Sequence, residues 1–196
     1  MAEFHENWYS EMQLSELAKL VEQVRDLPGA LIEVGCWEGR STVRIAASCT
    51  PAPLHAIDHW LGNVDEGQNH PSVVAVAKRD VYGTFLQNVA PFPNVIAHKA
   101  SGEDVLSTWD APIKFAHVDS GHTYDSTYRI VKLILPHVVP GGIVCGDDYL
   151  EAHIGRRDLG GGVQRAVGEL LPYHSVVGNF WYWRDSGVRH SLTITL

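Results

Sequence analysis

The chain has 196 residues and a formal net charge of -8, a length that suits one domain built around a single core. With 45% hydrophobic and 19% charged residues it has the composition of an ordinary soluble globular protein rather than that of a disordered or membrane chain. The acidic balance argues against a general nucleic-acid binder, because phosphate contacts need a clustered basic surface, and it favours a small-molecule partner.

The sequence shows no sign of membrane insertion or export. No stretch approaches the roughly 20 apolar residues of a membrane span, and the N-terminus carries acids where a secretory signal has an apolar centre. We therefore expect a cytoplasmic protein with no membrane partner. Three cysteines, Cys36, Cys49 and Cys145, are too widely spaced for a CxxC pair or a disulfide framework, and we interpret them as reduced structural thiols.

Secondary-structure signals alternate along the chain. Apolar residues from Trp8 to Val24 recur at helical spacing until Pro28-Gly29 ends the pattern. Apolar runs follow at residues 30–34, 54–57, 95–97, 113–118 and 142–145. Helical stretches separate or follow them at residues 40–48, 73–89, 101–107, 123–135 and 162–171. Because such runs are typical of strands buried on both faces, the alternation predicts a doubly wound α/β fold with a parallel sheet.

The last part of the chain has a different pattern. Two β-branched and aromatic segments, residues 175–184 and 190–196, flank the turn sequence D-S-G, which predicts a closing antiparallel hairpin. The insertions at 61–71 and 149–161 have no periodicity. Since there is no repeat or linker, we expect a single domain over residues 1–196, with an N-terminal helix within 1–28 and an α/β core over 29–196.

The segment after the first expected strand, L-I-E-V-G-C-W-E-G-R-S-T, suggests a ligand site. Ligands of open parallel sheets bind at the carboxyl ends of the strands. Gly35 allows a sharp turn, Gly39 allows a ligand to approach the backbone, and Ser41 with the free N–H groups of the next helix suits a carboxylate. Glu33 offers an acceptor for a cation at the same corner. The spacing matches neither the dinucleotide motif nor the Walker loop, so an amino-acid group fits better than a pyrophosphate.

The second expected strand ends at Asp58, where doubly wound folds place an acid that binds ribose hydroxyls. A ligand that combines an amino-acid end with a nucleoside is S-adenosylmethionine. Each motif alone also occurs as a structural turn in other α/β proteins, but the two in order, one βαβ unit apart, favour this cofactor.

Three aspartates follow the fourth and fifth expected strands: Asp119, Asp147 and Asp148. Clustered acids repel one another, whereas Mg²⁺ or another divalent cation takes oxygen ligands, so they predict a metal site. The alternative is structural, with Asp119 capping the next helix and the other two forming a turn. His122, three residues after Asp119, is placed to accept a proton at the same edge.

With these motifs in this order, the chain resembles the class I S-adenosylmethionine-dependent methyltransferases. It is most similar to a small bacterial branch related to macrocin-type sugar O-methyltransferases and, further off, to catechol O-methyltransferase. The resemblance runs from about Trp8 to Arg184 and includes A-I-D-H-W-L-G, H-V-D-S-G-H-T-Y-D and V-P-G-G-I-V-C-G-D-D-Y. It implies a Rossmann-like, seven-stranded, mostly parallel sheet with an antiparallel C-terminal hairpin strand.

The resemblance also implies roles for single residues. Ser101 and Gly102 fall where the family contacts adenine, His122 falls where metal-dependent relatives place a base, and Trp37 and Trp60 either wall the pocket or pack against the sheet. The candidate cofactor residues are Glu33, Gly35, Trp37, Gly39, Ser41, Thr42, Asp58, His59, Trp60, Ser101, Gly102, Glu103 and Asp119. The candidate metal ligands are Asp119, Asp147 and Asp148, and the candidate catalytic residues are His122 and Asp119.

These inferences predict an enzyme that transfers a methyl group from S-adenosylmethionine to a hydroxyl oxygen of a small molecule, such as a sugar or diol, with help from Mg²⁺. Arg156 and Arg157 either meet an anionic group of the acceptor or are solvated. Two alternatives stay open: a metal-dependent phosphate or glycan enzyme, which the missing Walker lysine disfavours, and a non-catalytic cofactor-binding module. The first helix and the end hairpin are the candidate surfaces for a homodimer.

Overall fold

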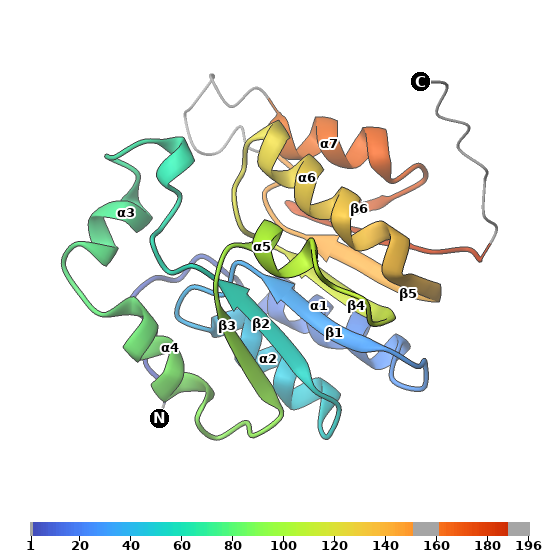
Figure 1. Cartoon of the computed structure of the whole chain (residues 1–196), viewed down its shortest axis with the longest axis horizontal. Coiled ribbons are helices and arrows are strands. Elements are labelled where there is room, and N and C mark those ends of the chain that lie inside the picture. Colours follow the sequence, from blue (N-terminus) through green and yellow to red (C-terminus); the bar gives the residue numbers. More distant parts are fainter. Residues whose placement is uncertain (1, 151–160, 188–196) are drawn as a thin grey trace.

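A seven-stranded sheet forms the centre of the computed structural model, which describes residues 2–150 and 161–187 (Figure 1). The strand order is β3-β2-β1-β4-β5-β7-β6. The strands are β1 (Ala30–Val34), β2 (Leu54–Asp58), β3 (Val95–Lys99), β4 (Ile113–Val118), β5 (Val138–Gly146), β6 (Ser175–Val177) and β7 (Phe180–Arg184). The first five are parallel and β7 runs antiparallel to both of its neighbours, which confirms the expected doubly wound, seven-stranded fold.

Helices cover both faces of this sheet. They are α1 (Glu11–Gln23), α2 (Arg40–Cys49), α3 (Pro71–Val76), α4 (Val81–Val89), α5 (Gly102–Leu106), α6 (Tyr124–Ile134) and α7 (Gly162–Leu170), with the short 3-10 helices η1 (Val64–Glu66) and η2 (Leu135–His137). Figure 1 shows α5, α6 and α7 in front of the sheet and α1 and α2 behind it. Two large apolar cores and a smaller third one beside α4 result, and β4 is buried along its whole length.

The first helix begins later than its apolar pattern suggests. Ser10 caps it: the Ser10 side chain accepts a hydrogen bond from the Gln13 backbone N–H (3.3 Å), and the Gln13 side chain accepts one from the Ser10 N–H (2.9 Å). Residues 2–9, which we call the N-terminal segment, precede this cap. None of the described helices has the length and apolarity needed to cross a bilayer.

Two expected elements differ from the structure. The single helix expected over 73–89 is two helices, because Asp80 caps α4 by accepting a hydrogen bond from the Gly83 N–H (2.8 Å). The 61–71 insertion, expected to lack any element, contains η1 and the first residue of α3. The first error arises because apolar spacing continues across residues 77–80, where the Asp80 cap starts a new helix. The second arises because a single turn of 3-10 helix is too short to show a periodic pattern.

The closing hairpin also lies elsewhere than expected. Its strands, β6 and β7, both fall inside the first expected segment, and Val177 pairs with Phe180 around the two-residue turn Gly178-Asn179. Gly178 has a φ of +63°, which the tight turn requires. The second expected segment, residues 190–196, lies outside the described residues, as do Arg156 and Arg157. The three cysteines are buried free thiols, as the sequence predicts.

Candidate active site

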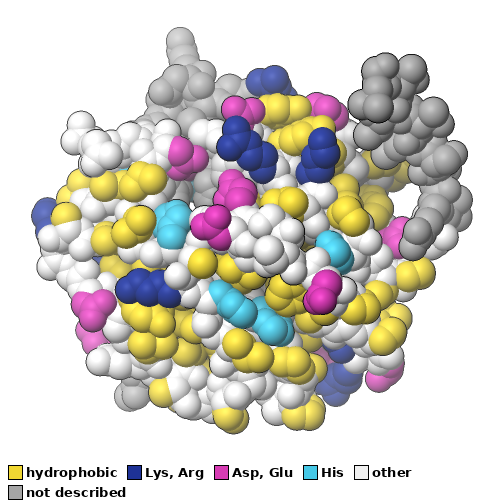
Figure 2. Space-filling model, viewed as in Figure 1, with side chains coloured by type: hydrophobic (Ala, Val, Ile, Leu, Met, Phe, Trp, Pro, Cys, Tyr) yellow, Lys and Arg dark blue, Asp and Glu magenta, His cyan; other side chains and the backbone are white. Residues whose placement is uncertain are grey.

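A cavity of about 1300 Å³ opens at the carboxyl ends of β1, β2, β4 and β5. Its wall combines the N-terminal segment, the loops that follow these strands, and the 61–71 insertion. This is the edge where open α/β sheets bind their ligands. On the face shown in Figure 2, lysine and arginine side chains are few and interleaved with acidic and apolar ones.

The loop after β1 is held by backbone chemistry. Gly35 has a φ of +89°, and a Cβ there would lie 2.0 Å from the carbonyl oxygen of Asp119, so only glycine fits. Asp58 fixes the same loop by accepting hydrogen bonds from the N–H groups of Cys36 (2.9 Å) and Trp37 (3.0 Å) on Oδ2, and from that of Trp60 (2.6 Å) on Oδ1. A carboxylate has about four lone-pair positions, so Oδ1 keeps one for a ligand hydroxyl.

Glu33 lies beneath this loop and not in the cavity wall. It is completely buried and accepts hydrogen bonds from the Thr42 hydroxyl and from His117, whose Nδ1 is 3.0 Å away. Burial lowers the pKa of His117, but the hydrogen bond and charge of Glu33 outweigh it and raise that pKa overall. The buried chain continues to the cavity, because the Tyr9 hydroxyl lies 3.1 Å from His117 Nε2 and donates to Asp119 Oδ2 (2.8 Å). Glu33 is therefore linked to Asp119 in the cavity wall through His117 and Tyr9, and does not line the cavity itself.

The structure divides the expected cofactor residues into two groups. Those in the cavity wall are Gly35, Trp37, Ser41, Asp58, His59, Gly102, Glu103 and Asp119. Those outside it are Glu33, Gly39, Thr42, Trp60 and Ser101. Gly39 faces the side chains of Phe85 and Val89, and Trp60 packs on Phe85 with ring centroids 4.8 Å apart. Ser101 caps α5. These three residues therefore support the segments that form the cavity wall without lining it.

The three expected metal ligands all line the cavity, but the compact group of donor atoms combines Asp119 and Asp148 with His122 and does not include Asp147. Asp147 is buried, and its Oδ2 accepts a hydrogen bond from Gln13 Nε2 (2.7 Å). Its Oδ1 is buried with no hydrogen-bond partner among the residues that the structure describes. Asp148, at a φ of +58°, binds Asn179 through Oδ1 (3.1 Å) and His122 through Oδ2 (2.8 Å). Donor atoms of Asp119, His122 and Asp148 all lie within 4.8 Å of one another.

Burial and mutual repulsion alter the acidity of this cluster. Burial, with the charges of Asp148 and Asp147, raises the pKa of Asp119 to about 7. Burial and the charge of Asp148 raise the pKa of Asp147 to about 6. Buried carboxyl groups that resist ionisation, one of them with an unpartnered oxygen, form a donor set that fits a divalent cation.

His122 lies at the same place, held between two carboxylates. Burial would lower its pKa, but hydrogen bonds to Asp148 and to Glu66 outweigh this and raise the pKa well above the usual range. Glu66 also accepts a hydrogen bond from the His122 backbone N–H (3.1 Å). Both ring nitrogens face a carboxylate in this arrangement, so His122 can accept another group's proton only after one nitrogen has lost its proton and its carboxylate partner has moved away.

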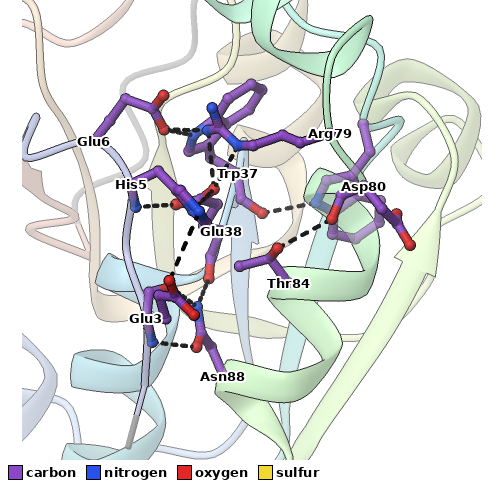
Figure 3. A network of polar contacts seen from close by, with 10 residues as sticks. Glu3, His5, Glu6, Trp37, Glu38, Arg79, Asp80, Thr84 and Asn88 are labelled. Atoms are coloured by element: carbon purple, nitrogen blue, oxygen red, sulfur yellow. Dashed lines mark hydrogen bonds and ion pairs between the residues drawn. The ribbon is translucent and has the colours of Figure 1, made fainter.

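The N-terminal segment lines the other side of the cavity. A network of polar contacts holds it there (Figure 3). The His5 N–H donates to Glu38 Oε2 (2.7 Å), and the Trp37 indole donates to Glu6 Oε2 (2.9 Å). Arg79, just before α4, binds both Glu6 and Glu38. Figure 3 shows these side chains gathered between the segment and the loop after β1. The segment is thereby tied to the loop that forms the expected cofactor corner.

Sequence patterns miss His117, Glu66 and His70. His117 on β4 pairs in register with the predicted residue Glu33 on β1, and two polar residues within buried strands are a usable signal once the register is known. Glu66 and His70 lie in an insertion without periodicity, and only the fold brings them to His122.

A family model described as a methyltransferase domain matches residues 32–149. No curated protein sequence matches the chain. Among solved structures, the O-methyltransferase NovP is similar at 18% identity, with 89% of this chain and 79% of that chain covered and a TM-score of 0.67.

Two further solved structures are similar. The O-methyltransferase TomG from Streptomyces achromogenes, in complex with S-adenosylmethionine, is 20% identical, with 90% of this chain and 81% of that chain covered and a TM-score of 0.63. CalS11, a TDP-rhamnose 3′-O-methyltransferase of calicheamicin biosynthesis, is 17% identical, with 89% and 80% covered and a TM-score of 0.59. The chain therefore belongs to the methyltransferase-domain family and adopts the fold of the class I S-adenosylmethionine-dependent methyltransferases.

Proposed function

We propose that this methyltransferase transfers a methyl group from S-adenosylmethionine to a hydroxyl oxygen of a small acceptor, such as a sugar or diol. A divalent cation would assist at the group formed by Asp119, Asp147 and Asp148 with His122, which we call the acid cluster. The observation that carries the proposal is the position of two different sites in one cavity: the corner formed by Gly35 and Asp58, and the acid cluster beside it. The names of NovP, TomG and CalS11 support O-methylation. The family match argues against a phosphate or glycan enzyme.

The cofactor is assigned to the corner by its chemistry. The amino-acid end suits the loop after β1 and the N–H groups at the start of α2, where Ser41 adds a hydroxyl. Asp58 Oδ1 suits a ribose hydroxyl, since one lone pair is left on it. Gly102 and Glu103, in the wall beyond β3, suit the adenine.

Asp119, Asp147 and Asp148 would hold a Mg²⁺ ion, since their carboxylates are buried and crowded and Asp147 Oδ1 is unpartnered. A bound ion of this kind lowers the pKa of an acceptor hydroxyl and orients it. Tyr9 and His117 position Asp119, and Gln13 positions Asp147.

Methyl transfer from a sulfonium to oxygen is an in-line displacement, so alignment supplies much of the rate. The hydroxyl must also lose its proton. We assign its acceptance to Nε2 of His122, after that nitrogen has released its own proton to solvent and Asp148 has turned away, with Asp119 as the neighbouring acid that shares the charge. The N-terminal segment excludes water from the cofactor side.

Calorimetric titration with S-adenosylhomocysteine tests the proposal, once with Mg²⁺ and a diol acceptor and once with chelator. We expect the nucleoside to bind in both conditions and the diol to bind only with Mg²⁺. Asp58→Ala should abolish nucleoside binding, while Asp147→Asn should abolish only the diol response. No nucleoside binding to the folded wild-type protein under either condition would disprove the cofactor assignment.

A further inference from the structure

A second group of metal-binding side chains lies in the cavity wall beside the acid cluster. Glu66, His70 and His122 each place one donor atom within 4.8 Å of the others. Glu66 ends η1 and His70 caps α3, so both come from the 61–71 insertion, while His122 comes from the loop between β4 and α6. Neither the sequence motifs nor the proposed reaction gives the insertion a chemical role.

The three side chains enclose one small space. His122 Nδ1 lies 3.1 Å from Glu66 Oε1, and His70 Nε2 lies 3.6 Å from Glu66 Oε2. The side chain of Glu66 is 1% exposed, whereas those of His70 and His122 are 12% and 15% exposed and both line the cavity. A ligand set of this kind is buried on the carboxylate side and open toward the cavity.

Neighbouring groups orient both imidazoles. The second nitrogen of His122, Nε2, is 2.8 Å from Asp148 Oδ2. The second nitrogen of His70, Nδ1, accepts a hydrogen bond from the Ser72 backbone N–H (3.3 Å) as the cap of α3 and also lies 2.7 Å from the buried Ser72 hydroxyl. Histidines that bind metals usually donate their other ring N–H to a carboxylate or another acceptor, which fixes the tautomer and the ring. Metal binding therefore requires His70 to move its proton from Nε2 to Nδ1, where it would be donated to the Ser72 hydroxyl in place of the cap bond, and requires His122 to release its Nδ1 proton. The lone pairs of His70 Nε2 and His122 Nδ1 would then both face Glu66.

The donor chemistry selects the ion. Mg²⁺ prefers oxygen donors and keeps several waters, whereas imidazole suits zinc and other first-row transition metals. Two histidines and one glutamate with an open position form a known type of zinc ligand set. We propose that Glu66, His70 and His122 form a second metal site, which takes Zn²⁺ or a similar transition-metal ion and is distinct from the acid cluster.

If the proposed function holds, a metal ion at this site would also affect methyl transfer. His122 would then have its Nδ1 lone pair on the ion and its Nε2 proton on Asp148. No lone pair remains to accept the proton of a hydroxyl. A transition-metal ion at the 61–71 insertion therefore blocks methyl transfer without occupying the acid cluster.

The test is competition for Zn²⁺ between the full chain and a chromophoric chelator, with excess Mg²⁺ present. We expect His70→Ala to weaken zinc binding at least tenfold, since even outer partners of a metal site contribute about 10- to 100-fold. His137→Ala is the matched histidine control, because His137 lies in η2, just before the amino end of β5 and away from the cavity. It should bind zinc like the wild type, as should Asp147→Asn.

Equal zinc affinity in wild type and His70→Ala would overturn the proposal, and so would loss of zinc binding in Asp147→Asn alone, which would place the ion at the acid cluster. If His70→Ala does not fold by circular dichroism, Glu66→Gln replaces it, because it keeps the size of the side chain. Anomalous diffraction from crystals with Zn²⁺ should show the ion between the three side chains, and a peak elsewhere would contradict the site. Nucleoside titration of the same samples separates this outcome from failure of the proposed function.

Discussion

The two halves of the cavity are built in different ways. At the cofactor corner, formed by Gly35 and Asp58, the Asp58 carboxylate accepts hydrogen bonds from three backbone N–H groups. Gly35 packs against the backbone of Asp119 in the loop after β4, so the shape of the corner depends on main-chain geometry. At the acid cluster, His122 and the aspartates bind one another through ionisable side chains. The corner should therefore keep its shape over a wide pH range, whereas protons and cations should remodel the cluster. Four predictions test this difference.

The largest effect is expected from Gly35→Ala. The new methyl group would lie 2.0 Å from the Asp119 carbonyl oxygen at a φ of +89°, so the overlap adds to the roughly 1–2 kcal/mol cost of a left-handed residue. We expect a loss of more than about 3 kcal/mol in the free energy of unfolding, measured with urea. Gly178→Ala, where φ is +63° and no atom lies within 4 Å, should cost only about 1–2 kcal/mol. Equal losses would contradict the close approach at Gly35.

The second prediction concerns His122→Ala in the acid cluster. Loss of a general base lowers rates by about 10² to 10⁴, so we expect a fall of that size in the rate of methyl transfer. Binding of S-adenosylhomocysteine should stay close to wild type, because His122 is not part of the cofactor corner. Full activity in this variant would remove His122 from the mechanism, and lost nucleoside binding would show that the two halves are not separate.

The third prediction concerns pH. The pKa of Asp147 is raised to about 6, so the folded protein binds this proton more tightly than the unfolded chain, whose usual aspartate pKa is 3.8. This contribution to stability is complete below pH 3.8 and is lost as the pH rises through 6. The free energy of unfolding of the wild type should therefore fall by on the order of 1–3 kcal/mol between pH 3.8 and about 6, and Asp147→Asn should abolish this fall. Urea unfolding at several pH values measures it, and Mg²⁺ should flatten the wild-type curve. Identical pH slopes in both proteins would refute the buried, crowded carboxyl.

The smallest effect is expected from Arg79→Gln in the contact between the N-terminal segment and the cofactor loop. Arg79 binds Glu6 and Glu38, and hydrogen bonds to charged groups contribute about 1.5–3 kcal/mol. We expect a loss of about 1–2 kcal/mol in the free energy of unfolding, because His5 still binds Glu38. Lys78→Gln is the neighbouring control and should be neutral. Thermal unfolding compares the two, and matched values would mean that the ion pairs contribute nothing.

The same division explains what the sequence could predict. The cofactor corner depends on local backbone chemistry, so a strand, a turn and a helix start predict that Gly35 and Asp58 lie at this edge of the sheet, and both line the cavity. The link from Glu33 to Tyr9 could not be foreseen, because it depends on the register between β1 and β4. Glu66 and His70 could not be assigned either, because their positions depend on contacts with a loop more than 50 residues away.

Apolar spacing predicted which segments become helices and strands but not where each ends. Asp80 divides one expected helix into two, and the turn at Gly178 falls inside an expected strand. In both places a local capping or turn residue outweighs a hydrophobic pattern that continues through it.

The contact between Gly35 and Asp119 joins the two halves of the cavity mechanically. No side chain separates the two backbones, and the Asp119 N–H also donates to the Val34 carbonyl (2.8 Å). A ligand that shifts the loop after β1 must therefore shift an acid of the cluster as well. Linkage then requires that cofactor and acceptor change each other's affinity by the same factor. Under the proposed function, the absence of a methyl group at Gly35 would thus couple the affinities for cofactor and acceptor through the backbone.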